Sequence, residues 1–398
     1  MWLHAILITS LGFGAAATLY AFGLAGVARI LRPRRDPGHA KPGAQRFLIV
    51  IPAHDEEATL PGTLQACAAL DYPAERFAVV VIADNCTDRT AEVTRTHGAR
   101  CLERHDTERR GKGFALEWAL ALLAGEDHDA VLVLDADCTV DPAALRVFDA
   151  RLREGARALQ ASYVASNAAE SPTSYVVALG MHMLSELFCA PKSRLGLAVF
   201  LLGTGIVLHR DVLARLPWKA RGVTEDTEYS LDLLRQNIPI VFVPEIHVWS
   251  RFPAGRRQLE VQRRRWAGGN LELCRHQAAP LILLGLRRGD RRLFDAGWTL
   301  LVLSRPLILF VVLGTVLLAW VDFRLQPGGL SRGLLALSIA VLGLQGLYFA
   351  SSAMHFGLGG GRLKLLLRSP VVIVRLALLT LGGLLRVGKP IWERTPRD

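Results

Sequence analysis

The sequence predicts an α/β domain that carries apolar, membrane-type helices on both sides. Three observations support this prediction. Apolar β-branched runs alternate with helical patterns inside a stretch of ordinary globular composition. Residues 5–28 hold no charge over a length that can cross a bilayer, and further apolar blocks follow the globular stretch. We therefore expect an anchor over 1–30, a globular domain over 44–278 and transmembrane and interfacial helices over 279–398.

The first apolar segment, residues 5–28, is expected to be an uncleaved anchor. A signal peptide carries positive charge before its apolar stretch. Here the positive charges follow the stretch, at Arg29, Arg32, Arg34, Arg35, Lys41 and Arg46. The positive-inside rule then places the globular domain in the cytoplasm of a multi-pass protein of the inner (plasma) membrane.

Within the globular domain, three apolar runs of the kind that form buried strands are each followed by a turn or acidic residue. These runs are FLIVI (47–51), VVVIA (79–83) and VLVL (131–134). Helical patterns lie between them, over roughly 57–70, 88–97 and 113–124. Apolar strands that alternate with helices predict a parallel sheet covered on both faces.

The residues that follow these strands are candidates for a ligand site. In open α/β sheets, ligands bind beyond the carboxyl ends of the strands. The first strand leads into Pro52 and His54, the second into Asp84 and the third into Asp135. We therefore expect these side chains to gather at one edge of the sheet.

The pair Asp135 and Asp137 is the most specific of these signals. Alternate residues of an extended chain point to the same side, so both carboxylates are expected to face one site. Two oxygen ligands suit Mg²⁺ or Mn²⁺, which bind few carboxylates together with phosphate oxygens. An aspartate after a strand is also a common turn former. The addition of Asp84 favours a metal and nucleotide site over three unrelated turns.

The run QRRRWAGGN at 262–270 offers cations for a phosphate. The chain has no G-x-G-x-x-G after its first strand and no G-x-x-x-x-G-K-[ST], so phosphate must be held by metal and side chains. On a helix, Gln262, Arg265 and Trp266 share one face. An arginine grips a diphosphate with its planar fork, and a tryptophan offers a flat apolar surface to a sugar. A solvated helix face or a membrane flank is the alternative for such a run.

The net charge of +11 does not indicate a nucleic-acid partner. Much of the excess flanks apolar segments, where cations face anionic membrane lipid. Examples are Arg287, Arg288, Arg291, Arg292, Arg362, Lys364 and Arg368. The six cysteines form no C-x-x-C pair, which argues against a zinc site or a disulfide framework.

The ordered motifs together resemble the membrane-integrated family 2 glycosyltransferases, the relatives of cellulose, chitin, hyaluronan and poly-N-acetylglucosamine synthases. The motifs are Asp84 in VIADNCTD, Asp135-Ala136-Asp137, Thr224-Glu225-Asp226 and QRRRW from Gln262, within roughly 47–270. The resemblance implies a GT-A (Rossmann-like) fold and inverting transfer of a sugar from a nucleotide sugar, expected to be a UDP-sugar. One departure is that Asp55 stands where the family commonly has asparagine in P-A-x-N-E.

The resemblance also implies a role for each motif residue. Asp226 is expected to be the catalytic base, because an acceptor hydroxyl must lose its proton as it attacks the sugar. Asp135 and Asp137 are expected to hold Mg²⁺ or Mn²⁺. The expected donor contacts are Pro52, His54, Glu56, Asp84, Lys112, Asp135, Gln262 and Arg265. The expected acceptor contacts are Gly203, Thr204, Glu225 and Trp266. Alternatively, Thr224 simply caps a helix that begins with acids.

The acceptor is left open between two classes. A growing β-linked polysaccharide is the first hypothesis, since Gln-x-x-Arg-Trp is typical of processive enzymes. Single transfer to a membrane lipid, as in ceramide-type glucosyltransferases, is the second, because so few apolar blocks make a lean channel. A membrane scaffold with an inactive domain is disfavoured because the metal and base residues are all present.

The C-terminal region is expected to supply two spans and one interfacial amphipathic helix. These are 297–321, 333–353 and 371–385. Arg375 interrupts the last apolar run, and a charge at mid-bilayer is costly. Arg305 and Pro306 are expected to shorten the first span to 306–321.

Overall fold

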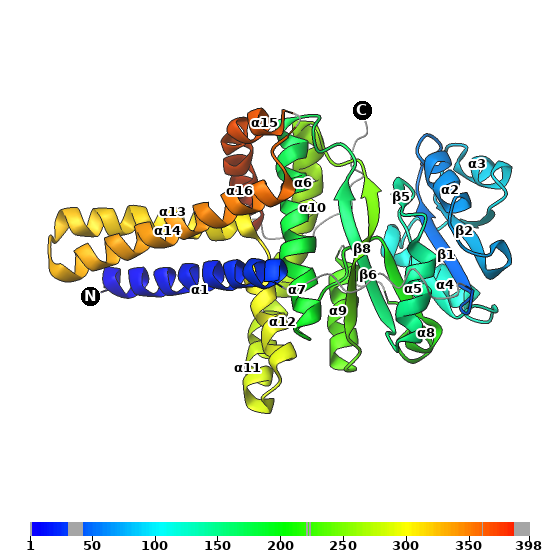
Figure 1. The fold of residues 1–398 in the computed structure, drawn as a ribbon, viewed down its shortest axis with the longest axis horizontal. Helices are drawn as coiled ribbons and strands as arrows, with labels where there is room; N and C mark the ends of the chain where they lie inside the picture. Colours follow the sequence, from blue (N-terminus) through cyan, green and yellow to red (C-terminus); the bar gives the residue numbers. More distant parts are fainter. Residues whose placement is uncertain (1, 31–42, 220–221, 223, 360, 386–398) are drawn as a thin grey trace.

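The computed structural model has a mixed sheet at one end and a bundle of long apolar helices at the other (Figure 1). It describes residues 2–30, 43–219, 222, 224–359 and 361–385. Within these ranges, the side chains of 264–267, 380–381 and 383–385 are outside the description. Helices α6 (Pro172–Leu184) and α10 (Arg256–Leu273) cross the molecule between its two ends (Figure 1).

The sheet has eight strands in the order β3-β2-β1-β4-β7-β6-β8-β5. Their bounds are β1 Phe47–Ala53, β2 Phe77–Asp84, β3 Arg100–Arg104, β4 Ala130–Val133, β5 Cys138–Val140, β6 Ala158–Ala165, β7 Ile206–His209 and β8 Ile240–Ser250. The three predicted strands are β1, β2 and β4, and they pair in parallel as expected.

A wholly parallel sheet was the wrong expectation. Strand β7 runs antiparallel to both of its neighbours, β4 and β6, and β5 runs antiparallel to β8. The expectation rested on strands before residue 135, whereas the reversed strand β7 lies beyond residue 200. The sheet is therefore parallel from β3 to β4 and mixed from β7 to β5.

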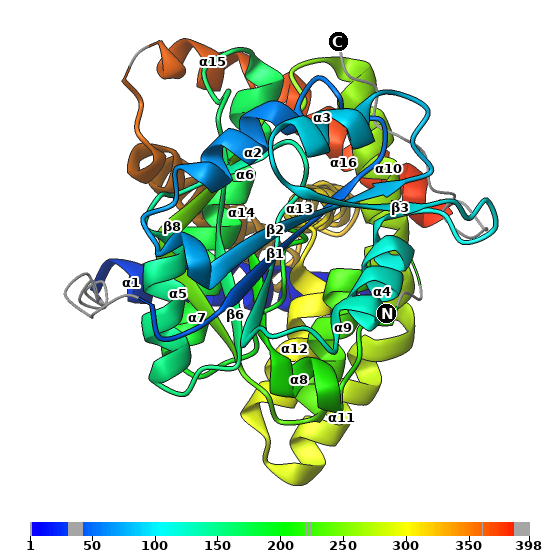
Figure 2. The same ribbon diagram turned by 90° about the vertical axis from the view of Figure 1, so that its right-hand side faces the viewer.

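Helices cover both faces of the sheet, and its strands β1, β2 and β4 are accordingly apolar along most of their length. The helices of this domain are α2 (Leu60–Ala68), α3 (Thr90–Thr96), α4 (Lys112–Leu123), α5 (Ala144–Arg153), α8 (Arg210–Arg215) and α9 (Glu225–Arg235). Leu48 and Val50 of β1 pack with the cluster that includes α4 and α9, whereas Ile49 and Ile51 pack with α2 and α5. Figure 2 shows α2 and α3 on one side of the strands and α4, α8 and α9 on the other.

Three long apolar helices form the bundle: α1 (Trp2–Ile30), α13 (Arg305–Leu325) and α14 (Gly329–Phe356). They lie side by side in Figure 1 and contact one another. The predicted block at 297–321 is divided, because helix α12 (Arg291–Val302) ends within it and α13 begins at Arg305 with Pro306 in its first turn. Helix α13 therefore begins at Arg305 and Pro306, where the shortened span was expected to begin.

Among the described residues, four helices are long and apolar enough to cross a membrane, and one of them was not expected. It covers Pro172–Arg194 and consists of α6, the π-helical turn η2 (Ser185–Cys189) and α7 (Ala190–Arg194). Some 67% of its apolar window is buried inside the protein. A helix that is apolar all round is also what a buried core helix requires, so packing accounts for its composition.

The C-terminal helices pack onto both ends of the molecule. Helix α11 (Ala279–Arg288) and α12 follow the π-helical turn η3 (Cys274–Ala278), and Leu281 and Leu300 pack against Phe200 and Leu231 of the globular part. Helix α15 (Arg362–Arg368) leads into α16 (Pro370–Leu385), which contacts α10 and α13. The interfacial placement of 371–385 stays a prediction.

A buried ion pair joins α7 to α12, and its carboxylate also contacts α1 of the bundle. Lys192 of α7 lies 2.9 Å from the carboxylate of Asp295 in α12, and both side chains are almost fully buried. Tyr20 of α1 donates to Asp295, and the Ala198 amide donates to the same carboxylate at 3.0 Å. Lys192 also donates to the hydroxyl of Thr299. A buried carboxylate needs hydrogen-bond donors of this kind. We call these five residues the junction network: Tyr20, Lys192, Ala198, Asp295 and Thr299.

Candidate active site

The two aspartates of the D-x-D motif lie in a turn between β4 and β5. The amide of Cys138 donates to the carbonyl of Asp135 at 3.1 Å, which closes the turn. Ligand atoms of Asp135, Asp137 and Cys138 all lie within 4.8 Å of one another. The expected extended geometry is wrong, since it is the turn that brings both carboxylates to one place.

Thr204 holds this turn in place through a hydrogen bond with its backbone. Its hydroxyl accepts a hydrogen bond from the amide of Asp135 at 3.0 Å, and the residue is only 1% exposed. An acceptor molecule does not reach a side chain so deeply buried. The geometry therefore gives Thr204 a positioning role in place of the expected acceptor contact.

Lys112 joins the D-x-D turn to the loop at Gly203. It is the first residue of α4, its ammonium pairs with the carboxylate of Asp135, and it donates to the carbonyl of Gly203 at 2.7 Å. Gly203 has φ +87°, and a Cβ there would lie 3.5 Å from a carboxylate oxygen of Asp226 and 3.9 Å from the Lys112 ammonium. The glycine thus leaves room where a cation and a carboxylate approach each other.

Glu225 and Asp226 open helix α9 beside this loop. The amide of Thr227 donates to Asp226 at 2.7 Å. Thr224 occupies the position before the helix, yet its side chain makes no capping hydrogen bond, so the capping alternative is not what holds this motif. The two acids therefore start the helix with their carboxylates close to Lys112.

Burial makes both carboxylates more basic than usual. It raises the pKa of Glu225 to about 7, helped by the charge of Asp226 and opposed by that of Lys112. Burial also raises the pKa of Asp226, whereas hydrogen bonds from Thr227 and the charge of Lys112 lower it. A carboxylate with a raised pKa is a stronger proton acceptor, which is what a general base requires.

Asp84 lies at the end of β2 in a buried ion pair. Its carboxylate accepts from Arg104 at 2.6 Å and from the amide group of Asn85 at 3.1 Å. Arg104 also pairs with Asp106 at 2.7 Å. Arg104 and Asp106 were not predicted as site residues, because RCLER (100–104) is too polar to indicate a strand. Both residues lie at or just after the carboxyl end of β3. If β3 had been predicted, the rule that ligands bind beyond the ends of strands would have identified them.

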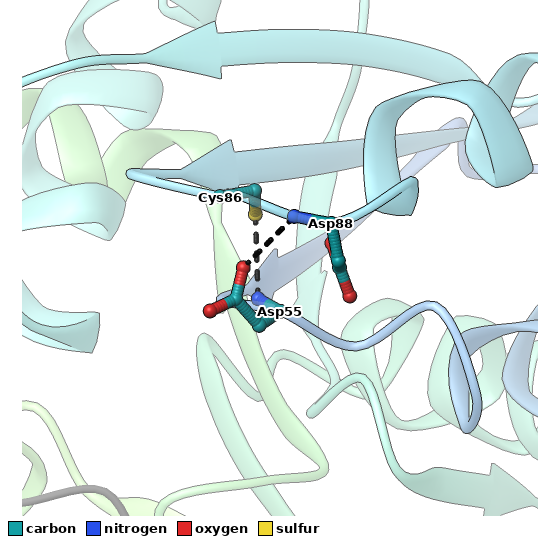
Figure 3. Close-up of side chains that lie close together, drawn as sticks. All are labelled: Asp55, Cys86 and Asp88. Atoms are coloured by element: carbon teal, nitrogen blue, oxygen red, sulfur yellow. Dashed lines mark hydrogen bonds between the residues drawn. The ribbon is translucent and has the colours of Figure 1, made fainter.

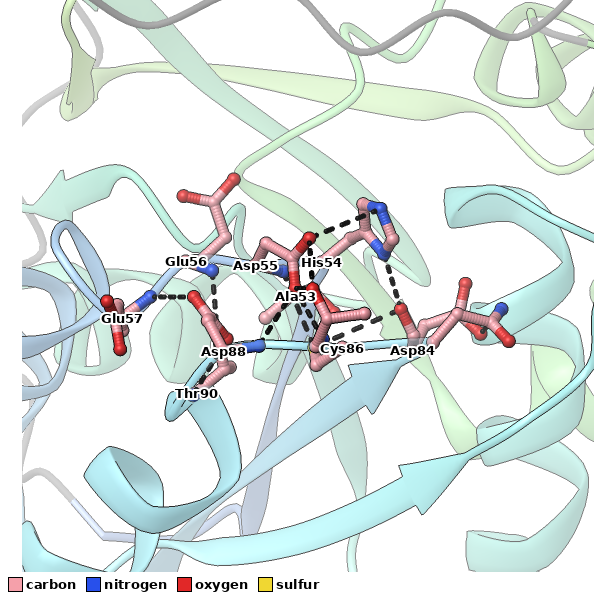
Figure 4. A network of polar contacts seen from close by, with 11 residues as sticks. Ala53, His54, Asp55, Glu56, Glu57, Asp84, Cys86, Asp88 and Thr90 are labelled. Carbon is pink, nitrogen blue, oxygen red and sulfur yellow. Dashed lines mark hydrogen bonds and ion pairs between the residues drawn. The ribbon is translucent and has the colours of Figure 1, made fainter.

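The loops after β1 and β2 are locked together by Asp55 (Figures 3 and 4). Asp55 has φ +54°, and its carboxylate accepts from the amides of Thr87 at 2.6 Å and Asp88 at 3.3 Å. Its own amide donates to the sulfur of Cys86. The departure from P-A-x-N-E is therefore accommodated, since aspartate forms the contact that fixes these loops. Because these backbone amides occupy one carboxylate oxygen of Asp55, we interpret the cluster of Asp55, Cys86 and Asp88 as structural.

His54 and Glu56 belong to the same loop network (Figure 4). The Nδ1 atom of His54 lies 2.7 Å from the carbonyl of Asp84, and the amide of Glu56 donates to the hydroxyl of Thr90 at 2.8 Å. Pro52 precedes them within β1. These residues gather at the carboxyl ends of β1 and β2, as the strand-end rule predicts.

Residues 258–266 are helical within α10, as expected. Gln262 is partly exposed, and its Oε1 atom is buried without a hydrogen-bond partner among the described residues. The predicted roles of Arg265 and Trp266 fall on side chains that lie outside the described ones. Arg263 is described, and burial together with the charge of Arg305 lowers its pKa to about 10. This basic run is therefore not a fully solvated helix face.

Comparison with known proteins identifies related sequences. The model of the family described as "Glycosyltransferase like family 2" matches residues 42–269. The probable glycosyltransferase YdaM of Bacillus subtilis is 26% identical over 231 residues, which cover 56% of this chain and 54% of that protein. A β-monoglucosyldiacylglycerol synthase of Nostoc sp. is 28% identical over 298 residues, which cover 73% of this chain and 60% of that protein. The chain thus spans little more than half the length of these relatives.

The fold is also similar to a solved structure. The mannosyltransferase PcManGT of Pyrobaculum calidifontis, in complex with GDP-Man and Mn²⁺, superposes with a TM-score of 0.58 at 19% identity. The match covers 88% of this chain and 98% of that one. The similarity therefore extends beyond the sheet into the helices that follow it.

Proposed function

Because this chain belongs to glycosyltransferase family 2 and has the family's GT-A-like fold, we propose that it transfers a hexose, with inversion, from a nucleotide sugar to a membrane lipid. The observation that carries this proposal is the meeting of Lys112, Asp135 and Asp226 around Gly203. A cation, a candidate metal ligand and a basic carboxylate are the groups that sugar transfer from a diphosphate needs.

Of the two acceptor classes that the sequence leaves open, we favour the membrane lipid over the polysaccharide. The relative from Nostoc sp. is named for the synthesis of β-monoglucosyldiacylglycerol, a lipid, and it aligns over 73% of this chain. Among the described residues, only three long apolar helices lie outside the sheet domain and its buried helix. A bundle this small supports docking of a lipid better than passage of a polymer.

Asp135 and Asp137 are proposed to hold Mg²⁺ or Mn²⁺. Their oxygens lie close enough for one ion and are of the hard type that both ions prefer. When bound, such an ion neutralises the diphosphate of the donor and of the leaving nucleotide. The Mn²⁺ complex of the mannosyltransferase from Pyrobaculum calidifontis is consistent with this assignment.

The remaining donor contacts are proposed from their places at the strand ends. Asp84, steadied by Arg104, faces the nucleotide base, with Pro52, His54 and Glu56 on the neighbouring loop. Lys112 balances charge at the diphosphate. Gln262 and Arg265 approach the same phosphates from α10.

Asp226 is proposed to take the proton of the acceptor hydroxyl as that oxygen attacks the anomeric carbon. Its raised pKa and its position next to Gly203 support this role. Glu225, Gly203 and Trp266 are proposed to form the acceptor side. Residues 44–278 are proposed as the catalytic domain, facing the cytoplasm, with the anchor at 1–30 and the helices of 279–398 in or on the plasma membrane.

The test is a transfer assay with purified protein in nanodiscs. UDP-glucose, UDP-galactose and GDP-mannose are offered in turn with diacylglycerol in the bilayer, in Mg²⁺, Mn²⁺ or EDTA. One glycolipid of a single added hexose, formed only with metal, supports the proposal. A series of products of increasing polymer length would show that the acceptor is a polysaccharide and not a lipid. Activity that EDTA leaves unchanged would refute the metal assignment.

A further inference from the structure

A groove of about 480 Å³ lies between helices α10 and α16, and none of the residues assigned to sugar transfer lines it. Its walls are formed by Arg256 and Glu260 of α10 and by Val371, Val374, Arg375 and Leu378 of α16. The volume lies within the range of ligand-binding clefts in proteins. Most of the wall is apolar, and Arg256 and Arg375 each contribute a guanidinium group to it.

The apolar wall belongs to a longer exposed stripe. Leu363, Leu367, Val371, Val374 and Leu378 recur every three or four residues along α15 and α16, and all five are exposed. Leu367 is 72% exposed and Val371 is 68% exposed. Contiguous apolar surface of this kind is uncommon in water. Helix α16 packs on α13 of the apolar bundle, so this stripe adjoins the helices that we expect to lie in the bilayer.

The charges of the groove favour an anion. Arg256 donates through Nε to Glu260 at 2.7 Å, which uses one of the five N–H donors of its guanidinium. Arg375 interrupts the apolar sequence of α16, and no described carboxylate forms an ion pair with it. Two arginines and one glutamate leave one net positive charge beside an apolar wall. A guanidinium fork matches the geometry of a phosphate group.

We propose that this groove binds an anionic phospholipid of the surrounding bilayer. The headgroup phosphate lies between Arg375 and Arg256, and an acyl chain runs along Val371, Val374 and Leu378. A free phosphate would make no use of the apolar wall, and an uncharged lipid would make no use of the arginines. The proposal stands whichever acceptor the enzyme uses.

The lipid would act on sugar transfer through α10. Gln262 follows Arg256 by six residues on this helix, a rise of about 9 Å. A headgroup held at Arg256 therefore fixes the first turns of the helix that carries the QRRRW motif. We expect anionic lipid to raise the transfer rate while leaving the chemistry at Asp226 unchanged.

The test measures lipid retention directly, by native mass spectrometry of detergent-purified enzyme with added dioleoyl phosphatidylglycerol or dioleoyl phosphatidylcholine. Wild type is expected to retain phosphatidylglycerol in preference to phosphatidylcholine. Arg375→Ala is expected to weaken that retention about tenfold, the usual effect of losing a charge-assisted hydrogen bond. Val374→Trp, which fills the apolar wall, is expected to weaken it as well.

Arg257→Ala is the matched control, because Arg257 is the exposed neighbour of Arg256 on the same helix and does not line the groove. It is expected to retain phosphatidylglycerol like wild type. Equal losses in Arg257→Ala and Arg375→Ala, or equal retention of the two lipids by wild type, would overturn the proposal. The nucleotide sugar is proposed to bind at a different site. A failed test of the proposed sugar transfer would therefore leave the lipid-retention results unaffected.

Discussion

Two lysine–aspartate pairs of this protein have the same chemistry and different surroundings. Lys112 and Asp135 form one pair in the candidate active site, with side chains that are 26% and 31% exposed. Lys192 and Asp295 form the other in the junction network, where the side chains are 1% and 5% exposed. The two pairs differ in how deeply their side chains are buried, and not in which charges they carry.

The difference shows what each pair is able to do. Asp295 also accepts from Tyr20 and from the amide of Ala198, so protein donors surround it. A buried pair with additional hydrogen bonds costs several kcal/mol to disrupt on one side. The Lys112 pair is open to solvent and lies beside the glycine at 203, so a ligand can rearrange it. One pair serves architecture and the other is suited to a charged substrate.

The test with the largest expected effect removes the proposed base beside the open pair. Asp226→Asn keeps the shape of the side chain but cannot take a proton, so kcat is expected to fall by about 10²–10⁴-fold. Donor affinity and the unfolding temperature should stay close to those of wild type. Steady-state transfer assays and nucleotide titration measure both quantities. Near-normal turnover would remove Asp226 from the role of base.

Breaking the closed pair should instead damage the fold. Lys192→Met leaves the carboxylate of Asp295 buried without its cation, and the free energy of unfolding is expected to drop by about 3–5 kcal/mol. Denaturant unfolding in detergent reports the loss. The double variant Lys192→Met/Asp295→Leu is the control, since removal of both charges should restore much of the stability. A stable single variant would show that the junction network is dispensable.

The same substitution at the open pair sharpens the comparison. Lys112→Met is expected to weaken donor binding by about ten- to a hundredfold, because a charge-assisted contact to the diphosphate is lost. Stability should change little, since Asp135 remains partly hydrated. Isothermal titration with the nucleoside diphosphate gives the affinity. If Lys112→Met destabilised the protein as strongly as Lys192→Met, the two pairs would not differ in kind.

The smallest expected effect is on the pH dependence of the open site. As the proposed base, Asp226 must be deprotonated to act, and burial raises its pKa, so activity is expected to be lost on acidification at a higher pH than for an ordinary aspartate. Glu225→Gln removes a neighbouring negative charge and should shift this acidic limb of kcat to lower pH. A pH–rate profile of both proteins tests the shift. An unmoved limb would mean that Glu225 does not influence the base.

The residues at the strand ends were predictable, because parallel strands all end at the same edge of the sheet. This rule placed Asp84 and Asp135 together from local apolar runs alone. Asp226 and Gly203 followed only from family resemblance, since no local pattern shows that they meet Lys112. The fold beyond residue 140 was harder, because β7 has four residues and pairs in the opposite direction.

Features that depend on packing had little signal in the sequence. The helix over 172–194 resembles a span in composition and is mostly buried in protein. Lys192 and Asp295 are 103 positions apart and each resembles an ordinary surface charge. Arg104 was hidden in a short polar strand. In each case a tertiary contact, and not a local preference, decides the role of the residue.

The hydrogen bond from Tyr20 to Asp295 has a consequence for synthesis of the chain. The two residues are 275 positions apart. At typical elongation rates of about 5–20 residues per second, the ribosome needs about 14–55 s to reach the second after the first. The anchor helix therefore emerges long before its partner, and all eight strands are translated in between. Helix α1 can pack on η2 and α7 as soon as they are made, whereas its hydrogen bond to Asp295 is a late step of assembly, so a nascent chain stalled before residue 295 lacks the last contact of the junction network.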